Sequence, residues 1–459
     1  MNFFNLIAIL IVISALFAYI NFRFIRLPSV IGVMLVSIFV SLGMILADRL
    51  GLGIAREGEY LLTNIDFKNT LMVWMLGFLL FAGALHVEFN ALHEQKWNVL
   101  VFSTVGVILS TIGVGTLMYF VLRWIGFPMG YIYCLLFGAL ISPTDPVAVM
   151  DLLRMAGAPK PVETAIAGES LFNDGIGVVI FTILYGISVG EHAFSPGSIA
   201  LLFAREAFGG ASLGLALGGG TYWLLKSIDN YQVEILLTLA LVIGGYALAV
   251  TLDTSGPITI VVAGLLVGNQ GRQFAMSDQT RERLTMFWEL VDEILNSILF
   301  VLIGVELLAV TFAQKYILAG LAAIPIALAS RYGSLALPKY ILRLGGLPGG
   351  ALKIMTWGGL RGGIAVALAL SLPLGQERNL ILTMTYLMVV FSIVVQSLTL
   401  KYVATWDALN MIQFEMITER FRHHEGKKPE PDAEQREGKH TSSSELDAIR
   451  RGDRHDNAQ

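Results

Sequence analysis

An apolar stretch of the chain, residues 163–187, contains four polar side chains close together: Glu169, Ser170, Asn173 and Asp174. In a helix, residues four positions apart lie on one face, so Glu169 lies above Asn173. The same spacing brings Ser170 next to Asp174. Carboxylate, hydroxyl and amide oxygens gathered in this way form a site that suits a small hard cation.

The alternative interpretation of this stretch is a polar stripe that joins packed membrane helices. The stretch is long enough to cross a bilayer, and a charge at the centre of a bilayer costs about 2.5 kcal/mol or more. Two carboxylic acids so close together are a costly way to join helices, and they favour a functional site.

A second apolar stretch, 131–152, is interrupted by the run Ser142-Pro143-Thr144-Asp145-Pro146. Each proline deletes a backbone N–H and displaces the carbonyl four residues earlier, so we expect the carbonyls of Ala139 and Ser142 to be freed. Broken helices near the bilayer midplane mark binding sites in secondary transporters. A simple proline kink is the alternative, but Asp145 between the prolines favours a helix that lines a cavity.

A third stretch, 352–373, contains Trp357-Gly358-Gly359-Leu360-Arg361-Gly362-Gly363. Glycines weaken a helix and let backbones approach closely, and Arg361 among them argues against packing alone. This interruption occupies the same place in the second half of the chain as the proline run does in the first. We therefore predict inverted repeats with two broken crossing helices, the fifth and the twelfth.

A fourth stretch, 317–342, contains Arg331. An unpaired arginine inside a membrane is implausible, so we expect an acidic partner, and Glu169 is the candidate. That ion pair would keep Glu169 ionised and leave Asp174 as the group that exchanges its proton. The alternative is that Arg331 extends toward the membrane surface.

Acidic residues also occur in the stretch 286–311. We interpret Asp292 as interfacial. Glu293 is a candidate for lining an entrance to the site.

These groups must be positioned by membrane helices, because 55% of the 459 residues are hydrophobic and only 14% are charged. Ordinary soluble domains carry roughly 25% charged residues. The net charge of −4 provides no basic face for nucleic acid, and the single cysteine, Cys134, excludes a disulfide framework or a zinc cluster. The first apolar run lacks the charge order of a signal peptide, so we expect a retained membrane helix.

About thirteen apolar runs are candidates for crossing a bilayer, which takes roughly 20 residues each. Lys and Arg are about twice as frequent in one set of alternate loops, which places the N-terminus outside and the C-terminus in the cytoplasm. The predicted runs are 3–22, 29–47, 70–87, 98–122, 131–152, 163–187, 197–224, 232–252, 255–268, 286–311, 317–342, 352–373 and 380–402.

The predicted organisation is one transmembrane domain, 1–404, followed by a cytoplasmic tail, 405–459. From about residue 419 the tail is polar, charged and poor in aromatic residues. Such a segment cannot bury enough surface to fold alone, so we expect it to be largely disordered.

The run Gly168-Glu169-Ser170-Leu171-Phe172-Asn173-Asp174-Gly175 resembles the signature of the monovalent cation:proton antiporter family 1, which includes the NhaP exchangers and the sodium–hydrogen exchangers. The proline run at 142–148 and the glycine run at 358–362 resemble two further segments of that family. Arg331 falls where the family carries the arginine that pairs with the glutamate. The four segments follow one another in the family's order over about residues 5–403.

The resemblance implies a homodimer in which a core domain, with helices within 98–187 and 317–403, moves against dimerisation helices within 3–87 and 232–311. It implies that Asp174 binds Na⁺, helped by Asp145, Ser170 and the Thr144 carbonyl. Asn173 would organise the site. Its place next to Asp174, where electrogenic relatives carry a second aspartate, implies an electroneutral exchange. Pro143, Pro146, Gly358, Gly359 and Arg361 would support the broken helices.

We therefore expect a secondary antiporter of the cell membrane that exchanges Na⁺ for H⁺, contributes to Na⁺ extrusion and pH regulation, and needs no cofactor. Cation and proton would compete for Asp174, and only the neutralised site would cross the low-dielectric barrier. Li⁺ and K⁺ accept the same oxygen ligands, so a K⁺/H⁺ antiporter is the alternative. An intramembrane aspartyl protease using Asp145 and Asp174 is a distant alternative, since neither aspartate has the sequence setting of such an enzyme. A passive channel would favour filters repeated around an axis, and no such repeat is present.

Overall fold

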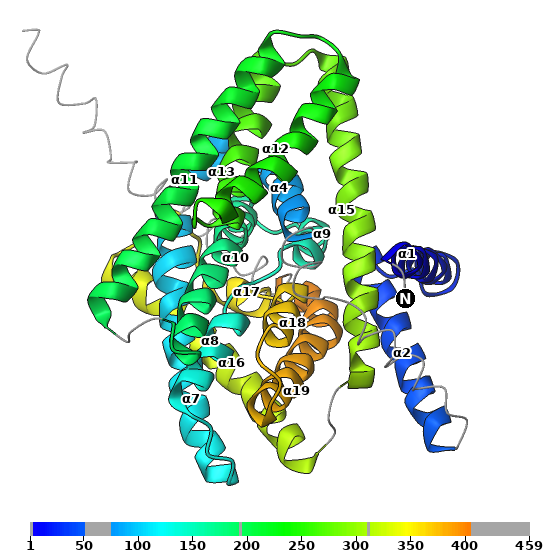
Figure 1. The fold of residues 1–459 in the computed structure, drawn as a ribbon, viewed down its shortest axis with the longest axis vertical. Helices are drawn as coiled ribbons and strands as arrows, with labels where there is room; N and C mark the ends of the chain where they lie inside the picture. The colour runs from blue at the N-terminus through cyan, green and yellow to red at the C-terminus, as the bar shows by residue number, and fades with distance from the viewer. Residues whose placement is uncertain (1–2, 51–74, 192–194, 310–312, 405–459) are drawn as a thin grey trace, which may run out of the picture. The chain divides into compact units, whose positions relative to one another are not determined.

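The structure is a computed structural model that describes residues 3–50, 75–191, 195–309 and 313–404 (Figure 1). Within these ranges the chain is helical and has no strand beyond one isolated antiparallel bridge between Asp145 and Leu360. The predicted all-α class is confirmed. The predicted tail, 405–459, and the start of the run 70–87 lie outside the described residues.

The first group of helices runs from the N-terminus to the helix that carries Glu169 and Asp174. Its α-helices are α1 (Phe3–Ile20), α2 (Ser29–Arg49), α4 (Leu76–His86), α5 (Phe89–Glu94), α6 (Lys96–Val101), α7 (Val107–Ile125), α8 (Tyr131–Ile141), α9 (Val147–Met155) and α10 (Lys160–Ser188). A π-helical turn joins α6 to α7, so that the two form one apolar helix, Lys96–Ile125.

The second group completes the described chain. Its α-helices are α11 (Pro196–Lys226), α12 (Tyr231–Thr251), α13 (Gly256–Leu266), α14 (Arg272–Phe274), α15 (Asp278–Glu306), α16 (Gln314–Ile341), α17 (Ala351–Trp357), α18 (Gly363–Leu370) and α19 (Gln376–Phe391). Helix α19 continues through a π-helical turn to Ala404.

Helices occupy the described part of every predicted apolar run, and eight of those described are long and apolar enough to cross a membrane. The figure of about thirteen crossings stays a prediction. Helix α15 begins at Asp278, earlier than the predicted 286, because the Ser277 hydroxyl accepts a hydrogen bond from the Thr280 N–H and starts the helix in a polar segment.

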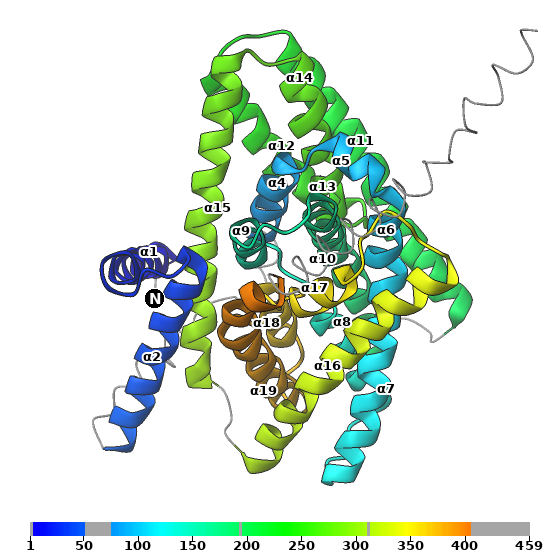
Figure 2. The same cartoon turned by 180° about the vertical axis from the view of Figure 1, so that it is seen from behind.

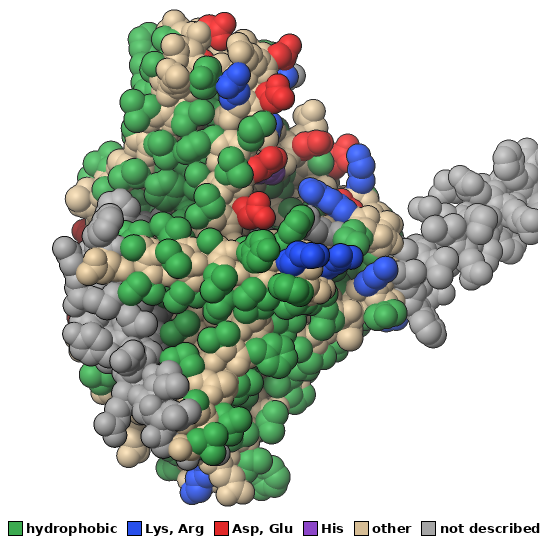
Figure 3. Space-filling model, turned by 90° about the vertical axis from the view of Figure 1, so that its right-hand side faces the viewer, with side chains coloured by type: hydrophobic (Ala, Val, Ile, Leu, Met, Phe, Trp, Pro, Cys, Tyr) green, Lys and Arg blue, Asp and Glu red, His purple; other side chains and the backbone are tan. Residues whose placement is uncertain are grey.

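Large hydrophobic side chains cover much of the surface in Figure 3, where the charged side chains gather mainly in the upper half of the view. Phe22 on the turn after α1, Trp124 on α7, Phe208 on α11 and Trp223 on α11 are each at least 70% exposed. A surface of this kind faces lipid rather than water, and aromatic residues near helix ends are typical of a membrane interface.

Helix α10 lies at the centre of the described helices in both views, between α4 and α13 on one side and α8 and α17 on the other (Figures 1 and 2). It packs against α8, α13 and α11 along its length. Helix α16 packs against α7 and α19. The polar side chains of α10 are therefore surrounded by protein, and this arrangement positions the candidate site.

Candidate functional site

The four polar residues predicted on α10 are all buried. Glu169 and Asn173 are fully buried, Ser170 is nearly so, and Asp174 retains 7% exposure. Buried polar groups need partners, and a buried charge needs either an opposite charge or a ligand. The partners of these four side chains therefore define what the site can do.

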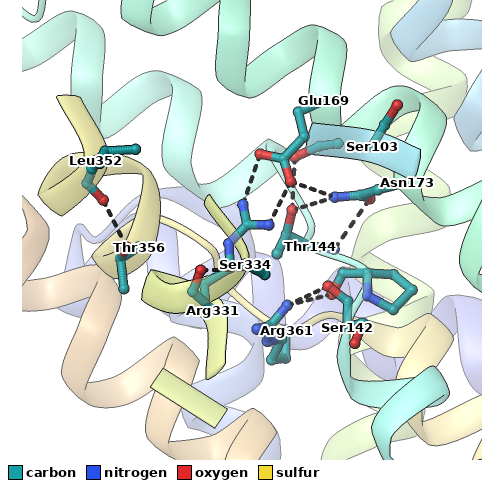
Figure 4. A network of polar contacts seen from close by, with 12 residues as sticks. Ser103, Ser142, Thr144, Glu169, Asn173, Arg331, Ser334, Leu352, Thr356 and Arg361 are labelled. Carbon is teal, nitrogen blue, oxygen red and sulfur yellow. Dashed lines mark hydrogen bonds and ion pairs between the residues drawn. The ribbon is translucent and has the colours of Figure 1, made fainter. Parts of the chain in front are cut away.

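Arg331 on α16 reaches α10 and forms a bidentate ion pair with Glu169 (Figure 4). Its Nη1 and Nη2 donate to Oε1 and Oε2 at 2.5 and 2.7 Å. Both side chains are almost fully buried. The planar guanidinium matches the carboxylate in geometry as well as charge, so Glu169 is neutralised by a fixed partner within the protein.

Asn173 joins α10 to the interruption between α8 and α9. Its Nδ2 donates to the Thr144 hydroxyl at 2.8 Å and to the Glu169 carboxylate at 3.3 Å, while its Oδ1 accepts the Thr144 N–H at 3.3 Å. The Thr144 hydroxyl lies 3.0 Å from that of Ser170. A carboxylate at position 173 could accept the Thr144 N–H but could donate neither of the other two bonds, so the amide organises the polar network in Figure 4.

The two interrupted helices meet at their gaps. Helix α8 ends at Ile141 and α9 begins at Val147, while α17 ends at Trp357 and α18 begins at Gly363. The Asp145 N–H donates to the Leu360 carbonyl at 2.8 Å. The gaps are thus joined backbone to backbone.

Arg361 closes the end of α8. Its Nη1 donates to the carbonyls of Ser142 and Pro143 at 2.7 and 2.8 Å. A cation at a helix C-terminus satisfies orphan carbonyls and offsets the negative end of the helix dipole. Of the two carbonyls that the sequence predicted to be freed, Ser142 is held by Arg361, and the second one held is that of Pro143 rather than Ala139. The Arg361 guanidinium lies past the C-terminus of α8, so it reaches the carbonyls that follow the last turn of that helix.

Glycines and prolines allow this close meeting. A Cβ at Gly359 would lie 3.2 Å from the Thr144 Cγ2, and one at Gly358 would lie 3.3 Å from the Val149 Cγ1 on α9. Pro143 packs against Gly177 on α10, and Pro146 provides the N-cap position of α9. Side chains at these glycines would separate the two interruptions.

A cavity of about 750 Å³ extends from this network to the surface. Asp145, Ser170 and Asp174 line its inner end, while Arg154, Lys160 and other exposed charged residues line its mouth. Asp174 makes no hydrogen bond or ion pair within the described part of the chain, although Asp145 and Glu169 are near enough to repel its charge. Of the two buried acids of α10, Asp174 is therefore the one that lies at the cavity.

Among the described residues of α10, those that line the cavity extend from Lys160 to Asp174 and no further. Ile176, Val179 and Ile183 on α10 pack with Val107 and Ile258 in a buried apolar cluster. Asp174 therefore communicates with one side of the protein, the side on which α10 begins.

The acidic residues of α15 require a correction. Asp292, interpreted from the sequence as interfacial, lines the cavity, whereas Glu293 is exposed and does not line it. Glu289 and Asn296, which the sequence interpretation did not assign to the site, line the cavity with Asp292. Spacings of three and four residues place Glu289, Asp292 and Asn296 on one face of α15. This spacing is visible in the sequence, but it identifies a cavity wall only when the position of the cavity is known.

Comparisons with known proteins agree with the predicted resemblance. The family model for the transmembrane sodium/hydrogen exchanger matches residues 11–406. The Na⁺/H⁺ antiporter NhaP of Pseudomonas aeruginosa is 48% identical over 402 residues, which cover 86% of this chain and 95% of the relative. The Na⁺/H⁺ antiporter NhaH of Halobacillus dabanensis is 35% identical, with 76% and 86% covered.

The fold is also similar to a solved structure. The sodium proton antiporter MjNhaP1 of Methanocaldococcus jannaschii superimposes with a TM-score of 0.71 at 18% identity, covering 88% of this chain and 99% of that one. Apolar helices and family membership together make the chain a multi-pass membrane protein. With a family model matched over most of its length and a relative close to half identical, the chain belongs to the sodium/hydrogen exchanger family.

Proposed function

We propose that this protein exchanges Na⁺ for H⁺ across the cell membrane by competition of the two ions for Asp174. Burial in a low-dielectric site disfavours an uncompensated carboxylate, and binding of either ion neutralises it. Only the neutralised site moves cheaply between the two faces of the membrane, which couples the flow of one ion to the flow of the other. The direction in cells would be Na⁺ out and H⁺ in.

One observation carries this proposal: α10 holds two buried carboxylates, and within the described residues only one of them has a hydrogen-bonded or ion-paired partner. Glu169 is paired with Arg331, whereas Asp174 faces the cavity. Asp174 is thus the group that an ion from solution can reach. The names of the relatives, which are Na⁺/H⁺ antiporters, support the same ions.

The charges around the site support an electroneutral exchange. The ion pair with Arg331 compensates the charge of Glu169, so the charge of Asp174 is the one on α10 that Na⁺ or H⁺ would neutralise. Asn173 next to it is neutral and adds no second charge, so one ion of either kind is enough for Asp174.

The proposed Na⁺ ligands are the Asp174 carboxylate, the Ser170 hydroxyl and the Thr144 carbonyl, with Asp145 close by. Asp145, Ser170 and Asp174 line one end of the cavity, which supports these three, and Thr144 is joined to them through the contact of its hydroxyl with that of Ser170. Asn173 would hold Thr144 in place through its hydrogen bonds rather than bind the ion.

The proposal includes a homodimer with an outer N-terminus and a cytoplasmic C-terminus. Helices within 3–87 and 232–311 would form the dimerisation domain, and those within 98–187 and 317–403 the moving core. Packing of α15 against α2 and α4, and of α16 against α7 and α19, supports this division. In that orientation the cavity opens to the cytoplasm.

The test is ion exchange by the purified protein in sealed vesicles with an acidic interior. Internal pH is followed on addition of Na⁺, Li⁺ or K⁺, with the membrane potential clamped by a permeant anion. Na⁺ should raise the internal pH, Asp174→Asn should abolish the response, and clamping should not change the rate.

The other outcomes separate the alternatives. A response to K⁺ alone would keep the mechanism and change the substrate to that of a K⁺/H⁺ antiporter. A wild-type response that depends on membrane potential would contradict electroneutrality. The absence of a response to any of the cations over a broad pH range would overturn the proposal.

A further inference from the structure

The cavity has a second polar face, formed by one side of α15. Glu289, Asp292 and Asn296 all line the cavity and follow one another at spacings of three and four residues. Glu289 is 58% exposed on its side chain, whereas Asn296 is buried. The stripe therefore leads from the mouth of the cavity toward its inner end.

The outermost member of this stripe already has a partner. The His86 ring on α4 lies 3.2 Å from the Glu289 carboxylate through Nε2, and its Nδ1 lies 2.8 Å from the Ala82 carbonyl. Glu289 is thus engaged at the mouth.

Asp292 is different. It makes no ion pair within the described residues, and it lies close enough to Asp145 for the two carboxylates to repel each other. Repulsion across a partly apolar cavity is stronger than in water. A cation between the two carboxylates would remove it.

Asn296 provides an independent sign of a ligand. It is 2% exposed, it lines the cavity, and among the described residues no acceptor is placed to form a hydrogen bond with its Nδ2, although the Asp292 carboxylate one turn earlier is near enough to attract it. A buried amide without a partner is unfavourable, so the position is suited to a polar guest. A half-turn of the side chain exchanges nitrogen for oxygen and would present Oδ1 to a cation or to its bound water.

We propose that Asp292 and Asn296 form a second cation site on the access route, where a partly hydrated Na⁺ is held before it moves to Asp174. Asp145, which lines the same cavity as both aspartates and lies close enough to repel each of them, would attract the ion inward. This inference rests on the proposed function and adds a separate site to it. The site is on α15, so a cation held there lies on the wall of the cavity opposite α10.

The first test is the Na⁺ dependence of exchange in inverted membrane vesicles, in which the cytoplasmic face is outside. Asp292→Asn should raise KM for Na⁺ about ten-fold with kcat changed less than about two-fold, because it removes binding that does not depend on the transport step. Asn296→Ala should raise KM in the same direction by a smaller factor. Glu293→Gln is the matched control, since Glu293 is adjacent, acidic and outside the cavity, and its KM should equal that of the wild type.

An unchanged KM for Asp292→Asn would overturn the second site while leaving Na⁺/H⁺ exchange by the wild type intact. A loss of kcat without a rise in KM would also overturn it, because it would place Asp292 in the transport step. If the wild type itself shows no exchange, the proposed function fails before the second site is tested.

The second test measures binding without transport. Asp174→Asn protein on a solid-supported membrane should still give a transient charge displacement when Na⁺ is added, because the second site remains. That signal should disappear in Asp174→Asn/Asp292→Asn and persist in Asp174→Asn/Glu293→Gln. No signal in Asp174→Asn, or an equal signal in all three proteins, would contradict the second site. Elution as a monodisperse species on gel filtration selects the variants to be compared.

Discussion

Two carboxylates on α10, five residues apart in the chain, have opposite surroundings. Around Glu169 the protein provides a bidentate arginine and an amide donor, so the charge is compensated within the fold. Around Asp174 it provides a cavity and no partner among the described residues. Both side chains are more than nine-tenths buried. Burial alone therefore does not identify the transporting acid, whereas the presence or absence of a fixed partner does.

The comparison predicts that losing the unpartnered acid affects transport and losing the partnered one affects the fold. Substitutions of Asp174 should therefore lower ion exchange in vesicles, whereas substitutions of Glu169 or Arg331 should lower the melting temperature in detergent. The expected effects are described from the largest to the smallest.

Asp174→Asn should lower the rate of exchange at least about 100-fold, since the amide can neither release a proton nor neutralise a cation. Its melting temperature should stay within about 2 °C of the wild type, because no hydrogen bond or ion pair to a described residue is lost. The rate is measured by pH recovery in vesicles and the melting temperature by intrinsic fluorescence. A well-folded variant that retains Na⁺-dependent proton flux would refute the assignment of Asp174.

Arg331→Ala should destabilise the protein by about 3–5 kcal/mol, because it leaves the Glu169 charge buried and uncompensated. Glu169→Ala should act in the same direction by isolating the arginine. The double variant Glu169→Gln/Arg331→Met removes both charges and should recover part of the loss. The measurement is the melting temperature of each variant in one detergent. Equal melting temperatures for Arg331→Ala and Asp174→Asn would remove the distinction between the two regions.

Arg361→Met should cost about 1.5–3 kcal/mol, the range for hydrogen bonds to charged groups, because the Ser142 and Pro143 carbonyls lose their donor. It should also reduce exchange, since these carbonyls end α8 next to Asp145. Arg361→Lys keeps the charge but lacks the planar guanidinium with its several N–H donors. Its melting temperature should therefore lie between those of Arg361→Met and the wild type. A melting temperature for Arg361→Met equal to that of the wild type would show that α8 ends stably without this contact.

Gly359→Ala should have the smallest effect, about 1–3 kcal/mol, because its Cβ would press on Arg331 and Thr144 at 3.1 and 3.2 Å. Gly219→Ala on α11 is the control, since a Cβ there meets nothing within 4 Å. The control should match or exceed the wild type in melting temperature. A difference of less than about 0.5 kcal/mol between the two variants would mean that the neighbours of Gly359 move aside freely.

The polar residues of the site could be found from the sequence because each is costly in an apolar helix. Arg331 required an acid, and the ion pair with Glu169 is the contact expected for it. The proline and glycine runs marked the places where α8 and α17 end. The meeting of Asp145 with Leu360 was beyond the sequence, since it depends on how α8 and α18 pack in space.

The acidic face of α15 could not be assigned from the sequence for a related reason. Asp292 and Glu293 are adjacent, and helical periodicity alone does not say which of them faces the protein. That is decided by the packing of α4 and α10 around the cavity. The polar start of α15 was missed because an apolar run marks the membrane part of a helix and not its capped end.

The hydrogen bond from the Asp145 N–H to the Leu360 carbonyl has a mechanical consequence. It joins the two interruptions through the main chain, so a displacement of α17 or α18 is transmitted to Asp145 without an intervening side chain. With Arg361 bonded to the same end of α8, the two gaps form one joint. Neither interrupted helix can slide past the other unless these hydrogen bonds break. The two gaps must therefore move together, or separate at a measurable cost in hydrogen bonds.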